Sequence, residues 1–186
     1  MRWHRFSFAL AISAMVLAVV ALFVFYTFAV PRTHAYAVAE RAGTLVNPVY
    51  ALSTEQARTQ FNSTFIFYLL YKLHVYDLHT PPLSSDTPRL MIDLGDAQYG
   101  VEIVRGVISV TPGAIGAPDI TIYSSKDEVI GMLRNEARVK ASFDSGKSSF
   151  KPHVGKALLF AKGYLHVYEQ AYSKTITGNV VKLTSD

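Results

Sequence analysis

The longest hydrophobic stretch of the chain covers residues 6–30, none of which carries a charged side chain. As an α-helix rising about 1.5 Å per residue it would be roughly 37 Å long, enough to cross a hydrocarbon core of about 30 Å. Arg2 and Arg5 precede the stretch, and Pro31 follows it. The pattern predicts a single transmembrane helix within residues 1–31 that anchors the rest of the chain.

A cleaved signal peptide is the alternative interpretation of this stretch. The apolar core of a signal peptide is usually about 7–15 residues long, so the length favours a retained anchor. Ala35-Tyr36-Ala37 nevertheless has the small-x-small pattern of a cleavage site. Arg2 and Arg5 flank one end of the stretch closely, and Arg32 and Arg41 flank the other end more loosely, which favours a cytoplasmic N-terminus and an external domain in a single-pass arrangement.

Helical signals follow the anchor. We expect residues 32–52 to form a juxtamembrane stalk, in which Asn47-Pro48 ends a short helix. Residues 53–56 read S-T-E-Q, a capping box that begins a helix continuing to Lys72. Residues 65–71 of this helix are apolar on every side, so they are expected to be buried in the domain or to lie against an apolar partner.

Alternation of apolar and polar residues then indicates strands with one buried face. Short turns between four such segments predict an antiparallel meander. A second capping box at Ser125 begins an amphipathic helix that covers the sheet. Residues 138–143 and 147–153 predict further strands, giving a sheet of about five. The four first segments are Leu90–Leu94, Tyr99–Val104, Val107–Thr111 and Asp119–Tyr123.

A last amphipathic helix is predicted from Gly155 onward, because apolar side chains recur there at helical spacing. Gly163 lies inside this helix and weakens it. Residues 53–173 are therefore expected to form one α+β domain, an antiparallel sheet covered by helices, and residues 174–186 a C-terminal tail.

The charge is uneven along the chain, whose formal net charge is +4. Residues 126–186 hold ten basic and six acidic side chains, which accounts for all of it. Their lysines are scattered rather than clustered, so nucleic acid is not a predicted partner. A basic face on anionic lipid head groups, or a solvated surface without a partner, both remain open.

Motifs of catalytic and metal sites are missing from the sequence. It has no cysteine, no Gly-rich phosphate loop, no G-x-S-x-G and no H-E-x-x-H. His74, Asp77 and His79 lie close in sequence, but the two histidines diverge on a helix surface, and we predict no metal site. No cofactor or enzymatic activity is expected. Asn62-Ser63-Thr64 is an N-x-T sequon, whose glycosylation the sequence does not decide.

A family resemblance rests on residues 117–125, which read A-P-D-I-T-I-Y-S-S and lead into the helix capped by Ser125. This segment is similar to a strand and short helix of the sterol carrier protein 2 (SCP2) family. Tyr99–Val110 is similar to the strand pair of that family, and Asp144–Lys147 to its S-G-K segment. The resemblance covers about Ser53 to Tyr172.

The sequence also departs from the SCP2 pattern at two places. Ser148–Pro152 is polar and interrupted by proline, where the family usually has an alternating apolar strand. The glycine that commonly ends the short helix is absent at Arg134-Asn135.

The resemblance implies an α+β fold that encloses an apolar tunnel for a lipid and has no catalytic residues. It leads to the hypothesis of a membrane-tethered, non-catalytic domain that binds a lipid, sterol or isoprenoid. The alternative is a single-span accessory subunit of a larger membrane complex without a small ligand, and a weaker one is an exported enzyme using residues 74–79. The expected tunnel residues are Phe61, Phe65, Tyr68 and Leu69 from the first long helix and Leu158, Leu159 and Leu165 from the last.

Overall fold

The computed structural model describes residues 15–20, 43 and 45–169 of the 186-residue chain. The chain divides into two compact units, Met1–Ala37 and Val38–Asp186. Residues 15–20 of the first unit are helical. The described residues contain no helix long and apolar enough to span a bilayer. The rest of the predicted anchor, the possible cleavage site, most of the stalk and the C-terminal tail lie outside the described residues.

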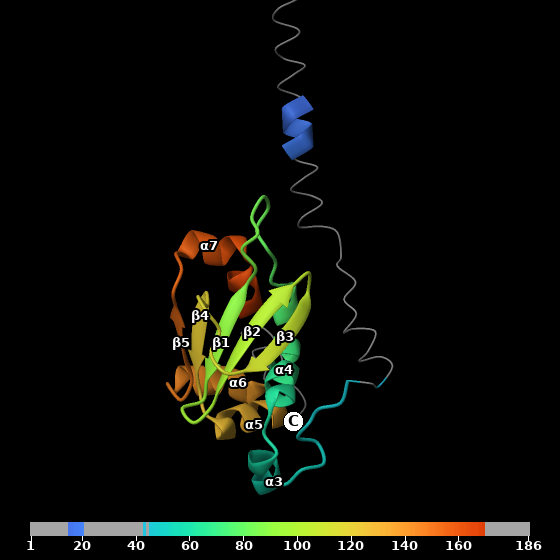
Figure 1. Cartoon of the computed structure of the whole chain (residues 1–186). Coiled ribbons are helices and arrows are strands. Elements are labelled where there is room, and N and C mark those ends of the chain that lie inside the picture. The colour runs from blue at the N-terminus through green and yellow to red at the C-terminus, as the bar shows by residue number, and fades with distance from the viewer. Residues whose placement is uncertain (1–14, 21–42, 44, 170–186) are drawn as a thin grey trace, which may run out of the picture. The chain divides into compact units, whose positions relative to one another are not determined.

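The second unit contains a five-stranded sheet with the strand order β3-β2-β1-β4-β5 (Figure 1). Neighbouring strands are antiparallel except for β1 and β4, which are parallel. The α+β class and the first four strands are confirmed, but the sheet is mixed and the prediction of a purely antiparallel sheet is wrong. The strands are β1 Arg89–Asp93, β2 Gln98–Val104, β3 Val107–Pro112, β4 Ile120–Tyr123 and β5 Ser149–Pro152.

The loop between β3 and β4 explains the parallel pair. It carries the chain from one edge of the meander across to the free side of β1, and on the way it passes Gly100 of β2. A Cβ atom at Gly100 would lie 2.8 Å from the Cβ of Ile115, so only glycine allows this close approach. From the sequence, this loop is indistinguishable from an ordinary turn, because its length does not show that it crosses the sheet to reach β1.

The inner face of the sheet carries the apolar half of the alternating pattern. Leu90 and Ile92 of β1 pair in register with Val101 and Tyr99 of β2, and all four side chains are buried. The intervening positions lie on the other face, where the period of two places polar side chains such as Glu102. The predicted burial of one face is thus confirmed for these strands.

The predicted helix from Ser53 to Lys72 is two helices, α3 Thr54–Thr59 and α4 Ser63–Lys72. The expected capping box at Ser53 is present at the start of α3. Asn62 has extended backbone angles and caps α4, because its side-chain oxygen accepts a 2.9 Å hydrogen bond from the Thr64 amide. The asparagine of the sequon therefore has a structural role, which the apolar pattern concealed.

Helices α4 and α5 (Lys126–Arg134) pack together over the sheet, and α5 begins at Ser125 as predicted. Residues 138–143 are not a strand but part of α6, Ala137–Asp144. The prediction failed because Val139 and Phe143 are four residues apart and fit a helix face as well as an alternating strand. In α6 the buried positions are Val139 and Ser142, which are three apart.

The C-terminal helix is also interrupted. Helix α7, Lys156–Ala161, ends before Gly163, whose φ of +88° belongs to the left-handed region, and residues 164–169 are again helical. A Cβ at position 163 would lie 3.2 Å from the ring of His79, just after the 3₁₀ turn η1 Val75–Asp77. The single last helix of the prediction is therefore two short segments.

A buried charge cluster attaches this C-terminal part to the sheet. Lys162 is 0% exposed, and its Nζ lies 2.7 Å from Oδ1 of Asp119 and 2.9 Å from Oδ2 of Asp86. The other carboxylate oxygen of Asp119 accepts 2.8 Å hydrogen bonds from the Tyr164 hydroxyl and the Arg89 amide. Each oxygen of the Asp119 carboxylate thus has a donor, as a buried charge requires.

Candidate ligand-binding hollow

A hollow of about 490 Å³ opens between α4, α5 and α6. Its volume lies in the range of small-molecule sites in proteins, about 300–1,000 Å³. Six of its lining residues are predominantly apolar, and five carry amide or charged groups. The apolar group is Tyr68, Leu69, Leu73, Met132, Leu133 and Val139, and the polar group is Asn47, Lys72, Arg134, Asn135 and Glu136.

The helix periodicity explains which side chains line the hollow. Leu69 of α4 and Leu73, the residue that caps its C-terminal end, are four residues apart and therefore lie on one face. Tyr68 and Lys72 repeat this spacing beside them. The opposite wall comes from the last turn of α5 and the first turn of α6, which two residues connect. The hollow therefore lies where the chain turns from one helix into the next.

Polar contacts hold the rim together. The ammonium of Lys72 lies 3.4 Å from Oε1 of Glu136, which joins α4 to the start of α6. Asn47 donates a 2.7 Å hydrogen bond to the carbonyl of Leu133 near the end of α5. Arg134 donates to the Thr54 hydroxyl at 2.7 Å and to the Leu52 carbonyl at 3.0 Å. The segment before α4 thus closes one side of the hollow.

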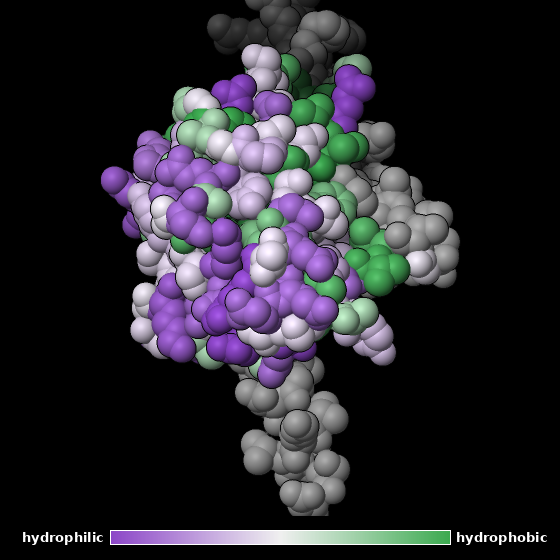
Figure 2. Space-filling model, turned by 60° about the horizontal axis from the view of Figure 1, so that its bottom comes forward, coloured by the Kyte–Doolittle hydropathy of each residue, from purple (hydrophilic) through white to green (hydrophobic). Residues whose placement is uncertain are grey.

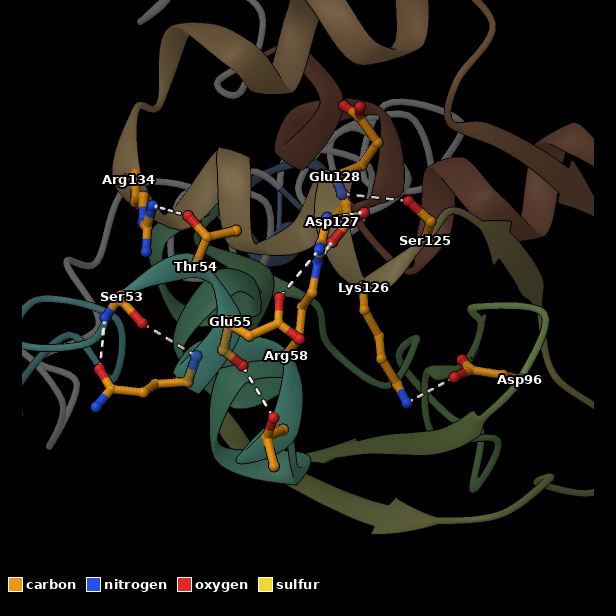
Figure 3. A network of polar contacts seen from close by, with 12 residues as sticks. Ser53, Thr54, Glu55, Arg58, Asp96, Ser125, Lys126, Asp127, Glu128 and Arg134 are labelled. Atoms are coloured by element: carbon orange, nitrogen blue, oxygen red, sulfur yellow. Dashed lines mark hydrogen bonds and ion pairs between the residues drawn. The ribbon is translucent and has the colours of Figure 1, made fainter.

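The contacts of Arg134 belong to a network between α3 and α5 (Figure 3). Arg58 of α3 donates a 2.7 Å hydrogen bond to Asp127 of α5, and this bond lowers the pKa of the Asp127 carboxyl below its ordinary value. Lys126 donates to Asp96 at 2.6 Å. Seen from this end of the domain, the described surface is mostly hydrophilic (Figure 2).

The structure places the predicted tunnel residues of α4 in two environments. Tyr68 and Leu69 line the hollow. Phe65 is buried in the core, and Phe61 packs on it with ring centroids 4.9 Å apart. The apolar side chains of α4 are thus covered largely by this domain, so they need no second protein to bury them.

The predicted residues from the last helix lie elsewhere. Leu158 and Leu159 are half-buried on α7, and Leu165 is exposed. None of the three lines the hollow. Helix α7 lies at the opposite end of the sheet from α5 (Figure 1). The two sets of predicted residues therefore do not share one described cavity, and their lipid binding stays a prediction.

Several lining residues were not assigned to a site from the sequence. The sequence pattern indicates Met132 and Leu133 only as the apolar stripe of a covering helix, and its alternation predicts a strand at Val139. The spacing of Val139 and Phe143 was the signal that could have revealed α6. Contact between α4 and the turn at residues 135–136 has no signal in a single sequence, because it depends on tertiary packing.

The histidine-rich segment forms local contacts. Nδ1 of His74 lies 2.8 Å from the Tyr76 hydroxyl and 3.8 Å from Oδ2 of Asp77, and His79 hydrogen-bonds through its amide to the Lys162 carbonyl. Within the part of the chain that the structure describes, no three His, Cys, Asp or Glu residues are gathered as metal ligands. Through these contacts, residues 74–79 connect the end of α4 to the C-terminal segment around Lys162.

Comparison with known proteins gave matches among solved structures only, since no family model and no curated protein matches the chain. A double mutant of the sec-alkyl sulfatase PisA1 is 17% identical, with a TM-score of 0.40 over 59% of this chain and 17% of the sulfatase. This chain therefore spans less than a fifth of that enzyme.

Two of the other similar structures are SCP2-like proteins. Sterol carrier protein 2 like 2 from Aedes aegypti is 16% identical, with a TM-score of 0.36 over 59% of this chain and 97% of that one. The UbiJ-SCP2 ubiquinone synthesis protein is 12% identical, with a TM-score of 0.35 over 73% and 96% of the two chains. All three TM-scores are below 0.5.

Proposed function

We propose that this protein binds an apolar or amphipathic small molecule, such as a lipid, in the hollow between α4, α5 and α6. The observation that carries the proposal is the size of the hollow together with its apolar wall. Each methylene group that a ligand buries there contributes about 0.8 kcal/mol, so a short hydrocarbon segment already gives measurable binding. The polar rim then orients the polar end of the ligand at the opening.

The proposal is one of binding without catalysis. General acid–base and nucleophilic catalysis require a titratable group or nucleophile within reach of the reacting atom. The side chains that line the hollow include no serine, histidine or aspartate. Of its charged groups, Lys72 and Glu136 are paired with each other, and Arg134 donates to Thr54 and Leu52. The hollow therefore offers apolar contacts and a charged rim.

We further propose that residues 6–30 tether the domain to a membrane, with the N-terminus cytoplasmic and the domain external. The length of this uncharged stretch and the two arginines before it support this arrangement. A tether would keep the binding domain close to the bilayer from which it takes its ligand, which raises the effective concentration of that ligand.

The ligand is tested by extracting lipid from the full chain purified in detergent and measuring it by mass spectrometry. We expect a stoichiometric lipid in the unmodified protein and its loss in Leu69→Glu, because a carboxylate in the apolar wall disfavours hydrocarbon. Leu158→Glu is the matched control, a half-buried leucine outside the hollow that should retain the lipid. No lipid in the unmodified protein would contradict the proposal. Loss in the control alone would move the site to the last helix.

The orientation is tested by labelling a single cysteine, since the chain has none of its own. Tyr50→Cys places a thiol at a position that is 87% exposed. A membrane-impermeant maleimide should label it in intact cells if the domain is external. Labelling only after lysis would contradict that orientation. The intact mass of the same protein shows whether the N-terminal stretch has been removed.

A further inference from the structure

A second group of apolar side chains lies outside the hollow, at the edge of the sheet formed by β5. Phe150 of β5 is 52% exposed, and Leu165 and Tyr168 in the helical residues 164–169 are 49% and 43% exposed. The ring centroid of Phe150 lies 6.2 Å from that of Tyr168 and 6.4 Å from that of Phe143. Leu165 and Tyr168 are three residues apart and share a helix face. We call these four residues the aromatic patch.

The patch continues the inner face of the sheet beyond the helices that cover it. Ile92 of β1 is buried, and its partner in register, Ile122 of β4, is half-buried. Ile122 pairs in turn with Phe150, which is exposed on the edge strand. Exposure thus increases along one row of apolar side chains. Contiguous exposed apolar groups of this kind mark interaction surfaces.

Basic side chains outnumber acidic ones in the segments that carry the patch. In residues 138–169, five exposed or half-buried side chains are basic and two exposed ones are acidic, while Lys162 is buried and adds nothing to the surface. Arg138 and Lys147 lie 3.7 and 3.6 Å from Glu128, and Lys140 pairs with Asp144. Lys151 and Lys156 form no ion pair within the described part of the chain. The five basic residues are Arg138, Lys140, Lys147, Lys151 and Lys156, and the acidic ones Asp144 and Glu169.

We propose that the aromatic patch contacts a bilayer that contains anionic lipid. Aromatic rings favour the head-group level of a membrane, and lysines close to an anionic surface add electrostatic attraction. Lys151 alternates with Phe150 and projects to the opposite face of β5, but its charge acts within the screening length of about 8 Å. The patch shares no residue with the hollow, so this contact does not depend on ligand binding there.

The test uses the full chain in vesicles of phosphatidylcholine, with and without phosphatidylserine. The only tryptophan of the sequence, Trp3, is replaced by phenylalanine, and Phe150→Trp then provides a fluorescent reporter at an exposed position. We expect lipid brominated in its acyl chains to quench this reporter when phosphatidylserine is present. Lys151→Gln with Lys156→Gln should lower the ratio of membrane-bound to free patch by on the order of tenfold.

The matched control is Val107→Trp, which is 55% exposed on β3, the opposite edge of the sheet. This reporter should stay unquenched in the same vesicles, which separates contact by the patch from simple attachment of the chain. Tyr168→Trp serves as a second reporter if Phe150→Trp does not fold. Equal quenching at both edges, or none at the patch, would overturn the proposal. A patch that binds a protein instead would give no quenching in these protein-free vesicles.

Discussion

Two polar clusters join parts of this domain, and they differ mainly in their exposure to water. Around Asp119, a buried lysine and a buried tyrosine contact one carboxylate. Between α3 and α5, Arg58 and Asp127 form a two-pronged pair at the surface, where water solvates both partners. Similar hydrogen bonds therefore have different consequences, because only the buried cluster leaves an unsolvated charge when it is broken.

The two clusters also stabilise different parts of the domain. The buried cluster joins the C-terminal segment around Lys162 to the residues at the start of β1 and just before β4. The exposed contacts hold α3 and the segment before it beside the hollow. We expect α3 and the segment before it to open more readily than α4 and α5, since α3 buries only Ala57 and local openings are drawn from regions with few buried contacts.

The largest effect is expected for Lys162→Met, which keeps most of the apolar stem but removes the charge. Asp119 would then be a buried carboxylate without its cation, and breaking such a pair costs about 3–5 kcal/mol. Urea unfolding of the full chain in detergent measures the change. Lys156→Met, at an exposed position of α7, is the control and should be nearly neutral. A loss below about 1 kcal/mol for Lys162→Met would show that the cluster is not coupled to stability.

A smaller effect is expected for Asn62→Ala. The substitution removes the hydrogen bond that caps α4 and should cost about 1 kcal/mol in the free energy of unfolding. Asn62→Asp keeps a capping oxygen but removes the glycosylation sequon, so it should unfold like the unmodified chain. Equal losses for both variants would mean that the asparagine stabilises the protein in another way.

The smallest effect is expected for Asp127→Asn, which breaks the exposed pair with Arg58. The folded-state pKa of Asp127 is lowered by the Arg58 hydrogen bond, so its contribution is present above the unfolded pKa and is lost as the pH falls through the folded value. Thermal unfolding at low salt should show a small decrease in Tm at neutral pH that vanishes under strongly acidic conditions. A decrease as large as that of Lys162→Met would contradict the comparison.

The sequence allowed the meander, the two capping boxes and the α+β class to be predicted, because these follow from local periodicity and end signals. It did not allow α6 to be recognised, since the four-residue spacing of Val139 and Phe143 fits both the period of two of a strand and one face of a helix. The parallel pairing of β1 and β4 depends on the loop that passes Gly100, and a single sequence carries no sign of such a crossing. Of the hollow, only Tyr68 and Leu69 were anticipated, because its other wall is created by tertiary packing.

The path of the chain past Gly100 has a consequence for how the domain assembles. Strands β1, β2 and β3 pair with their neighbours in sequence, whereas β4 reaches β1 only after the intervening residues have traversed the sheet. Contacts between residues far apart in sequence form late, because the chain loses the entropy of loop closure before these contacts can stabilise it. We expect pulsed hydrogen exchange during refolding to protect Val101 and Ile103 before Thr121, and simultaneous protection would show that the two halves form together.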